Sequence, residues 1–493
     1  MSWALYTLLA VPLAATGLTL RDGWRLARAA TLISGLASLA LAVVLAVAVA
    51  HGRVLETADG WLRLDSLGAV FLLATGLLYA MAGVFSIGYL KAERGRPGFC
   101  AFAQRYFALL NLFGWSMLLV PLAADFGTLW VALELTTIVS ALLIAIDRTD
   151  AALEASWKYV LIASSGLGIA LLSIVVLYAA GTHVLGSAYV PRFERLLLHA
   201  HGLSPDAVRL AFVLSLVGFG TKVGFVPMYT WLPDAHSEAP APVSALLSGS
   251  LLAGALYAIL RVFQVVVAAG ERSFAEHALI VFGVASLLAA SFFVLRQGNY
   301  KRLLAYSSIE HMGIIALGVG FGVPLAVAGA LLHVITHASA KGLAFFGAGS
   351  LLRGYDTKEV DGVTAAAGAM PWTGPMFLAG ALALSGLPLS GVFRSEFQIV
   401  AGGFAGAQYV GVTLLLVFVN LAFFGVVWHA GRMVLGPAAE PAAGATGPAR
   451  ERSAWMVAAM LGCLFVVLAL GVHLPGELSA LLANAGHRLA VPA

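Results

Sequence analysis

The chain has 493 residues, of which 61% are hydrophobic and only 11% are charged, with a formal net charge of +4. Soluble domains carry about 25% charged residues, so the composition excludes an ordinary soluble protein, and the absence of a basic cluster excludes a nucleic-acid partner. The two cysteines, Cys100 and Cys463, lie far apart in apolar sequence. They therefore give no support for a disulfide framework, a zinc site or an iron–sulfur site.

Apolar segments long enough to cross a bilayer as helices recur along the whole chain. With a length of about 20 residues per span, the sequence predicts an all-α polytopic membrane protein with about 14 transmembrane helices. The predicted spans are 3–20, 29–50, 66–90, 104–122, 125–146, 155–180, 207–229, 240–266, 275–295, 303–321, 324–352, 371–399, 407–435 and 454–474. The first span lacks a preceding basic segment and a following cleavage site, so we expect a retained helix and not a signal peptide.

The longest polar stretches, 181–206 and 436–453, leave no room for a soluble domain. The first contains "PRFERLLLHAHGL", a short amphipathic piece expected at the membrane interface. The second is rich in Ala, Gly and Pro and is expected to be a loop. Lys and Arg are more numerous in the odd-numbered loops, which predicts that these loops face the cytoplasm. With an even number of spans, both termini then lie on the outer side of the inner (plasma) membrane.

Ionisable residues inside the predicted spans are the main functional candidates, because each costs about 2.5–3.5 kcal/mol at the bilayer centre. Glu134 lies near mid-depth in "FGTLWVALELTTIVSALLIA". It is interpreted as a proton site or the partner of a buried cation; the alternative is a neutral carboxyl bonded to Ser or Thr. Lys158 lies near the start of its span. It is interpreted either as a proton-path residue or, equally well, as a lysine whose side chain extends to the membrane surface.

Lys222 lies in "GTKVGFVPMYTWLPDAHSEAPAPVSA", where glycines and two prolines, Pro227 and Pro233, predict a broken helix. A break at membrane depth is tolerated only where it is buried in protein or lines a wet cavity. Burial disfavours the charged form of a lysine, so Lys222 is expected to exchange a proton near neutral pH. The alternative is a lysine that reaches the membrane surface.

The acidic tail of this stretch, Asp234, His236 and Glu238, falls in an odd-numbered loop and is expected near the cytoplasmic face. Its D-x-H-x-E pattern allows a metal site, a proton entry or a local turn. Bonding of freed backbone groups beyond Pro233 by Asp234 and His236 is the favoured interpretation. Proton entry is the second.

Two further segments carry titratable groups. In "LLHVITHASAKGLAFF", His333, His337 and Lys341 are spaced i, i+4 and i+8, which places them on one helix face. This stripe predicts a proton wire; the alternatives are hydrogen-bonded core histidines, or a metal site, for which no further ligands are evident nearby. The segment "ALSGLPLSGVFRSEFQIV" is a second Gly/Pro-interrupted span, in which Glu396 is the expected titrating group. Paired broken helices are typical of inverted repeats and of an ion path.

The motifs of soluble enzymes are absent: there is no phosphate-binding loop, no G-x-S-x-G and no C-x-x-C. No cofactor, metal or catalytic residue of the chain's own is therefore expected. Whether the chain counts as part of an enzyme stays open.

The segments "GTKVGFVPMYTWLPDAHSEAPAPVSALLSG", "NYKRLLAYSSIEHMGIIALG" and "HVITHASAKGLAFFGAGSLL" resemble the signature segments of the proton-translocating antiporter-like family. This family includes membrane subunits of respiratory complex I, of Mrp-type cation/proton antiporters and of group 4 nickel–iron hydrogenases. The resemblance covers roughly 65–435, and its wording is most similar to the hydrogenase-4 component F subfamily.

The resemblance implies 14 core helices with two inverted five-helix repeats, each containing a broken helix. It divides the chain into N-terminal helices (1–100), a first repeat (101–270), a second repeat (271–435) and a C-terminal loop and helix (436–493). It also implies proton-path roles for Glu134, Lys222, the stripe His333, His337 and Lys341, and Glu396, with a weaker candidate at His311.

One departure concerns the eighth span. Some relatives carry a lysine or histidine there, whereas "ALLSGSLLAGALYAIL" offers only Ser248, Ser250 and Tyr257, so waters or hydroxyls would have to bridge that step. The chain also ends at about the fourteenth span, without a long lateral helix.

The implied function is proton translocation in the membrane arm of a redox-driven complex. The implied partners are other membrane-arm subunits and a peripheral hydrogenase or dehydrogenase arm with iron–sulfur clusters. The alternatives are a subunit of a multisubunit cation/proton antiporter and, third, a non-pumping scaffold or an uptake subunit for an anion or inorganic carbon.

Overall fold

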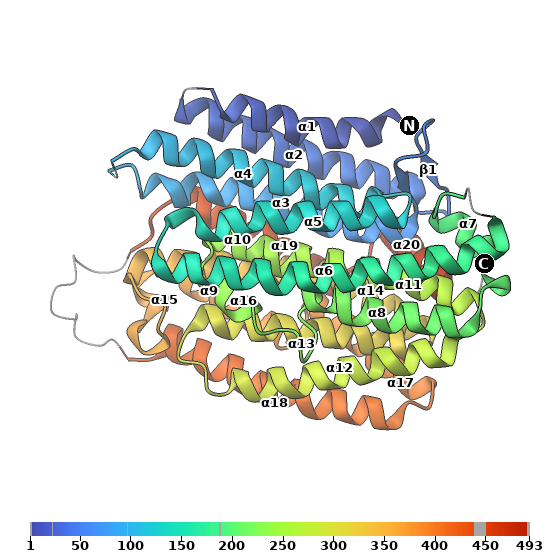
Figure 1. Ribbon diagram of the computed structural model, residues 1–493. Coiled ribbons are helices and arrows are strands. Elements are labelled where there is room, and N and C mark those ends of the chain that lie inside the picture. The colour runs from blue at the N-terminus through green and yellow to red at the C-terminus, as the bar shows by residue number, and fades with distance from the viewer. Residues whose placement is uncertain (1, 22, 96, 187–188, 438–449, 491–493) are drawn as a thin grey trace.

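The computed structural model describes residues 2–21, 23–95, 97–186, 189–437 and 450–490 and is almost entirely helical (Figure 1). The helices are α1 (Trp3–Thr19), α2 (Trp24–Val49), α3 (Ser66–Lys91), α4 (Phe99–Leu119), α5 (Phe126–Ile144), α6 (Asp150–Leu185), α7 (Phe193–Leu198), α8 (Pro205–Val223), α9 (Leu232–Glu238), α10 (Ala241–Leu246), α11 (Leu252–Ala268), α12 (Arg272–Val294), α13 (Tyr300–Gly320), α14 (Pro324–Tyr355), α15 (Ala366–Ala369), α16 (Thr373–Leu384), α17 (Gly391–Ala405), α18 (Tyr409–Leu435), α19 (Ala454–Val472) and α20 (Gly476–Ala490). Two short strands, β1 (Leu55–Glu56) and β2 (Arg63–Leu64), pair antiparallel.

The long helices lie side by side along one direction, and the N- and C-terminal ends lie at the same end of the bundle (Figure 1). Every predicted span coincides with a helix or with a broken pair of helices. Within the described residues, ten helical segments are long and apolar enough to cross a membrane, judged by length and composition. The chain is therefore a helical membrane protein.

Polar residues at the helix starts fix several of these boundaries. Asp65 accepts a hydrogen bond from the backbone N–H of Gly68 at the start of α3, at 2.9 Å. Asp125 does the same for Thr128 at the start of α5, at 2.8 Å. Such side chains satisfy backbone donors that the helix itself leaves unpaired.

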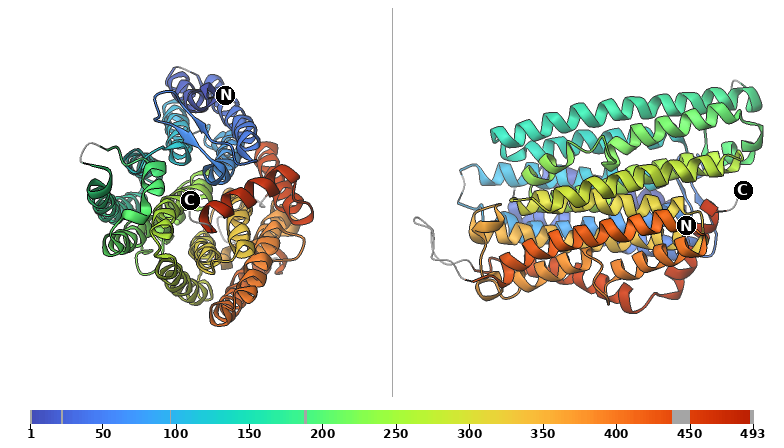
Figure 2. Two further views of the ribbon diagram at one scale, coloured as in Figure 1. Left: turned by 90° about the vertical axis from the view of Figure 1, so that its right-hand side faces the viewer. Right: turned by 90° about the horizontal axis from the view of Figure 1, so that it is seen from below.

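Burial separates inner from outer helices. Nearly all residues of α3, of the α10–α11 segment and of α13 are buried, whereas fewer than half are buried in α2, α6, α12, α18 and α19. Most of α14 is buried as well. Seen along the bundle, the outer helices surround these inner ones (Figure 2).

Both predicted helix breaks are present. The first helix of the first break, α8, ends at Val223, with Gly224 in the left-handed region at φ 84°. The short α9 and α10 follow before the chain resumes as α11, and a π-helical turn lies at Leu247–Leu251. The second break separates α16 from α17, with Gly386 at φ 70° and Ser390 capping α17.

Three features lie outside the predicted spans. The amphipathic piece forms α7, as predicted, but the β1–β2 hairpin departs from the all-α prediction. The expectation that the chain ends at about the last span is wrong, because α20 follows it; the helix lies across the end of the bundle (Figure 2). Its inner face carries Leu481, Leu482, Ala485 and Leu489, all buried. The predicted loop 436–453 falls largely outside the described residues.

Candidate functional site: a buried line of titratable side chains

Lys222, at the end of α8, is fully buried and held by α5. Its Nζ donates to the carbonyl oxygen of Leu133 at 2.6 Å and also bonds Thr137 Oγ1. Glu134 lies one residue along from that carbonyl, and its charge interacts with that of Lys222. Ser164 on α6 donates to Glu134 Oε1 at 2.9 Å. The two charges are thus neighbours on packed helices, although they are not in a direct ion pair.

A hydrogen-bonded set of side chains surrounds Lys222. The hydroxyl groups of Tyr159 and Ser140 are 2.9 Å apart. Trp231 packs at a tilt against Tyr159 with 4.6 Å between ring centroids, and its indole N–H donates to the carbonyl of Thr221 at 2.8 Å. This set joins α5, α6 and α8 to the start of α9.

The three residues of the D-x-H-x-E segment have separate environments on α9. Asp234 pairs with Arg302 and lies 3.5 Å from Lys158 Nζ, while Glu238 pairs with Lys358 at 2.8 Å. His236 is fully buried, and the charge of Lys341 acts on it. The favoured interpretation of Asp234 and His236 as local caps is wrong, because no side chain caps α9; instead the acidic groups tie α9 to its neighbours.

Lys158 is neither buried nor free. It lies on α6 with 37% of its side chain exposed and pairs with Glu154 at 2.5 Å as well as with Asp234. It therefore links α6 to α9 through a partly exposed ion pair.

Lys341, in the middle of α14, is also fully buried. Its Nζ donates to Ser307 Oγ at 2.6 Å and to the carbonyl of Leu304 at 2.8 Å, both on α13. The adjacent Ser308 lies 2.7 Å from Ser248 in the π-helical turn. The hydroxyl pair Ser248–Ser308 thus connects the eighth predicted span with the surroundings of Lys341. The sequence analysis expected hydroxyl groups of that span to serve at this step.

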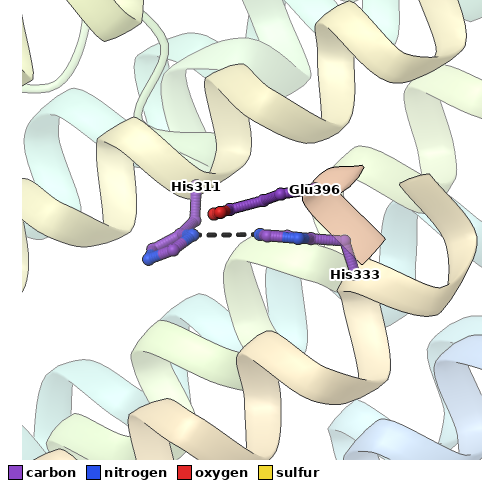
Figure 3. Close-up of side chains that lie close together, drawn as sticks. All are labelled: His311, His333 and Glu396. Atoms are coloured by element: carbon purple, nitrogen blue, oxygen red, sulfur yellow. Dashed lines mark hydrogen bonds between the residues drawn. The ribbon is translucent and has the colours of Figure 1, made fainter. Parts of the chain in front are cut away.

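Three histidines on the inner helices α13 and α14 are also fully buried. His311 on α13 and His333 on α14 are hydrogen-bonded, with 2.9 Å between Nδ1 and Nε2 (Figure 3). The ring centroid of His337 lies 4.9 Å from that of His311. The predicted stripe is therefore completed by a histidine from a second helix, so that His311 is a full member of the cluster.

Glu396 on α17 reaches the same cluster (Figure 3). The preceding residue, Ser395, lies 2.8 Å from His333 Nδ1 and donates its own proton to the carbonyl of Val392. The Ser395 oxygen therefore accepts from His333 Nδ1–H, and His333 Nε2 is left as an acceptor for His311. The ligand atoms of His311, His333 and Glu396 all lie within 4.8 Å of one another. The sequence analysis found no further metal ligands near the histidine stripe of α14. In the structure, His311 of α13 and Glu396 of α17 lie beside His333 of that stripe.

Glu310 was missed by the sequence interpretation. It is buried on α13 with 4% exposure, and its charge interacts with those of Lys341 and Glu396. It stands within "LLAYSSIEHMG", inside a predicted span. Like Glu134, it is therefore an ionisable residue at membrane depth and a functional candidate by the same criterion.

Arg261 lies in the eighth predicted span just after the segment that offers Ser248, Ser250 and Tyr257, so this span does carry one charged side chain. This residue is 3% exposed and forms a two-point ion pair with Asp65, at 2.9 and 2.7 Å. Tyr257 and Gln264 accept further hydrogen bonds from the same guanidinium group. An arginine stays protonated and here has every donor group occupied, so it fixes α11 against α3 and does not relay protons.

Together, the fold and the buried titratable residues define a polytopic helical membrane protein with a charged axis through its interior. Residues 123–423 match the family model described as "NADH:quinone oxidoreductase/Mrp antiporter, TM", and the chain belongs to this family. It is 34% identical to a "Hydrogenase-4 component F homolog" of Methylacidiphilum infernorum, over 83% of this chain and 85% of that protein. It is 31% identical to NADH-quinone oxidoreductase subunit N of Desulforudis audaxviator, over 79% of each.

Solved structures show the same fold at lower sequence identity. A chain of the Mrp complex from Dietzia superposes with a TM-score of 0.87 at 22% identity, covering 100% of this chain and 98% of that one. A chain of the archaeal membrane-bound sulfane sulfur reductase superposes with a TM-score of 0.85 at 22% identity, covering 99% and 98%. Chains of at least two membrane complexes therefore share this fold.

Proposed function

We propose that this chain is a proton-translocating membrane-arm subunit of a redox-driven complex of the group 4 hydrogenase or NADH:quinone oxidoreductase type. One observation carries the proposal: Lys222, Lys341, three histidines and Glu396 are all buried inside the helix bundle, and the partly buried Glu134 lies next to the residue that binds Lys222. Buried ionisable groups are costly in a membrane protein and mark proton or ion paths. A scaffold would have no use for such a series.

The proposed proton path has two halves. In the first, Glu134 balances the charge of Lys222, and Thr137 accepts a hydrogen bond from the lysine. In the second, Glu310 balances the charge of Lys341, and Ser307 accepts from that lysine.

Beyond Lys341, the chain of contacts to Glu396 is formed by neutral donors and acceptors. Here His311 donates to His333, and His333 donates to Ser395, next to Glu396. Protonation of one group changes the charge that its neighbour experiences, which is how a buried series passes protons on.

The proposed repeats place these groups at matching positions. In the repeat 101–270, the second span carries Glu134 and the fourth, broken span carries Lys222. In the repeat 271–435, the second span carries Glu310 and the fourth, broken span carries Glu396. This correspondence supports two inverted five-helix repeats. It also supports 14 spans, since α1, α8, α14 and the α16–α17 pair add to the ten candidate spans.

The same proposal covers the surroundings of the chain. The partners are further membrane-arm subunits and a peripheral redox arm with iron–sulfur clusters, in the inner membrane. The position of both chain ends at one end of the bundle (Figure 1) supports termini on the same side of the membrane, and the loop charges favour the outer side. Proton entry from the opposite end by way of Asp234, His236 and Glu238 on α9, with Lys158 beside them, remains part of the proposal.

A cation/proton antiporter subunit is the second candidate, and the superposition on the Mrp complex chain favours it. The greater similarity to a hydrogenase-4 component F homolog favours redox drive.

The test is Lys222→Ala in membrane vesicles that contain the complete complex, with Lys91→Ala, exposed at the end of α3, as the control. We expect Lys222→Ala to lose proton movement driven by electron transfer, and Lys91→Ala to retain it. Proton movement that needs a sodium gradient and no electron donor would instead support the antiporter, and unchanged pumping in Lys222→Ala would refute both.

A further inference from the structure

The junction between α13, α14 and α17 presents three metal-ligand side chains to one point. The donor atoms of His311, His333 and Glu396 lie within 4.8 Å of one another (Figure 3). Both histidines are fully buried and Glu396 is 9% exposed. We propose that this junction is a binding site for a divalent transition-metal ion of the Zn²⁺ class.

The donor set selects the kind of ion. Two imidazole nitrogens and one carboxylate oxygen suit Zn²⁺, Fe²⁺, Co²⁺ and Ni²⁺, whereas Mg²⁺ and Ca²⁺ prefer oxygen ligands alone. Ligands at about 2.0–2.1 Å from a tetrahedral ion lie about 3.3 Å apart. The His311 and His333 nitrogens, 2.9 Å apart, would open slightly to hold such an ion, and the Glu396 carboxylate would move to complete the set.

The surroundings of His333 support this use. Ser395 accepts from its Nδ1–H, because the serine proton is donated to the carbonyl of Val392. This fixes the tautomer and leaves the Nε2 lone pair facing His311 and Glu396. A hydrogen bond to the second nitrogen is the usual way in which a metal-binding histidine is oriented.

The carboxylate of Glu396 also lacks a partner that a cation would provide. Its Oε1 is buried and has no hydrogen-bond partner within the described part of the chain. Its Oε2 lies against the helix break, since a Cβ added to Gly386 would be 2.5 Å from it. In that break, Leu387 and Leu389 are 43% and 71% exposed. The wall of the site on this side is therefore a short irregular segment at the surface of the chain.

Binding would have one consequence for transport, and this consequence rests on the proposed function. An ion held by His311, His333 and Glu396 replaces the hydrogen bond between the two rings and keeps Glu396 deprotonated. The last steps of the proposed path then stop. Micromolar zinc is expected to inhibit proton translocation without inhibiting electron transfer to the same extent.

The binding test uses the purified full-length chain in detergent, freed of metal by a chelator and titrated with Zn²⁺ against a coloured competitor. We expect one tight site per chain that excess Mg²⁺ does not occupy. Replacing a ligand, in Glu396→Gln or His333→Gln, is expected to weaken binding by about tenfold to a hundredfold, as even second-layer changes do in other sites. The control is His487→Gln, on the exposed face of α20.

A spectroscopic measurement keeps the test decisive if a ligand variant fails to fold. Cu²⁺ bound to the wild-type chain should give an electron paramagnetic resonance spectrum with couplings from two imidazole nitrogens. Binding below one ion per chain, a spectrum without histidine nitrogen, or equal affinities of Glu396→Gln and wild type would overturn the site. Tight, ligand-dependent binding that leaves proton translocation unaffected would confirm the site and contradict the proposed proton path.

Discussion

The buried ion pair between Asp65 and Arg261 gives the sharpest prediction about stability. The pair is bidentate, its side chains are 2% and 3% exposed, and the guanidinium also bonds Tyr257 and Gln264. Replacing Asp65 by Asn leaves a buried guanidinium without a counter-charge. Removal of one partner from such a pair costs about 3–5 kcal/mol, so Asp65→Asn is expected to lower the free energy of unfolding by this amount.

The double variant separates the cost of the unpaired charge from other losses. Arg261→Met leaves the buried Asp65 with only the more distant Arg488, at 3.9 Å, as a counter-charge, whereas Asp65→Asn with Arg261→Met removes both charges of the buried pair. The double variant is therefore expected to be more stable than either single variant, with a coupling of about 2–3 kcal/mol.

The assay is reversible unfolding in mixed micelles by increasing SDS, followed by helical circular dichroism. The matched control is the exposed pair Arg432–Asp361, whose side chains are 50% and 80% exposed; Asp361→Asn should cost about 0–1 kcal/mol. Single variants at Asp65 and Arg261 that cost less than about 1 kcal/mol, or a double variant whose cost is the sum of both, would refute the reasoning.

Two further predictions concern the second half of the path and the packing beside Lys222. Glu310→Gln should slow redox-linked proton translocation by about a hundredfold, the lower limit for a positioned proton-transfer group, with Glu310→Asp partly active; full activity of Glu310→Gln in vesicles would remove it from the path. Gly218→Val should destabilise the chain in SDS titration by about 1–3 kcal/mol, because a Cβ there would lie 2.4 Å from the backbone nitrogen of Ala170. Gly17→Ala is the control, because a Cβ added to Gly17 has no atom within 4 Å; it should be neutral or slightly stabilising. Equal losses of stability in Gly218→Val and Gly17→Ala would show that the close contact between α6 and α8 is not the reason for glycine at position 218.

Local sequence patterns were enough to predict the long apolar helices and both breaks. Long apolar runs have few alternatives to membrane helices, and glycine and proline close to Lys222 and Glu396 leave backbone groups that a continuous helix cannot satisfy. The i, i+4, i+8 spacing likewise placed His333, His337 and Lys341 on one face, because helical periodicity determines that relation within a single helix.

Contacts between helices were not predictable in the same way. The bond between His311 and His333 depends on how α13 packs against α14, which the periodicity of neither helix specifies. The metal-ligand cluster went unrecognised for this reason.

Other omissions did have a signal in the sequence. Glu310 and Arg261 are charges within apolar spans, and α20 has apolar residues at helical spacing. Its polar residues, however, made it unlike a membrane span.

The most direct test of the central claim is the number of protons moved per electron pair in vesicles that contain the complete complex with Lys341→Met. Lys341 on α14 is fully buried against α13, and it is the lysine of the second half of the proposed path. The proposed path predicts that electron transfer continues while the proton ratio falls, with Lys91→Ala unchanged. An unaltered proton ratio at an unaltered rate of electron transfer would contradict proton passage along this axis.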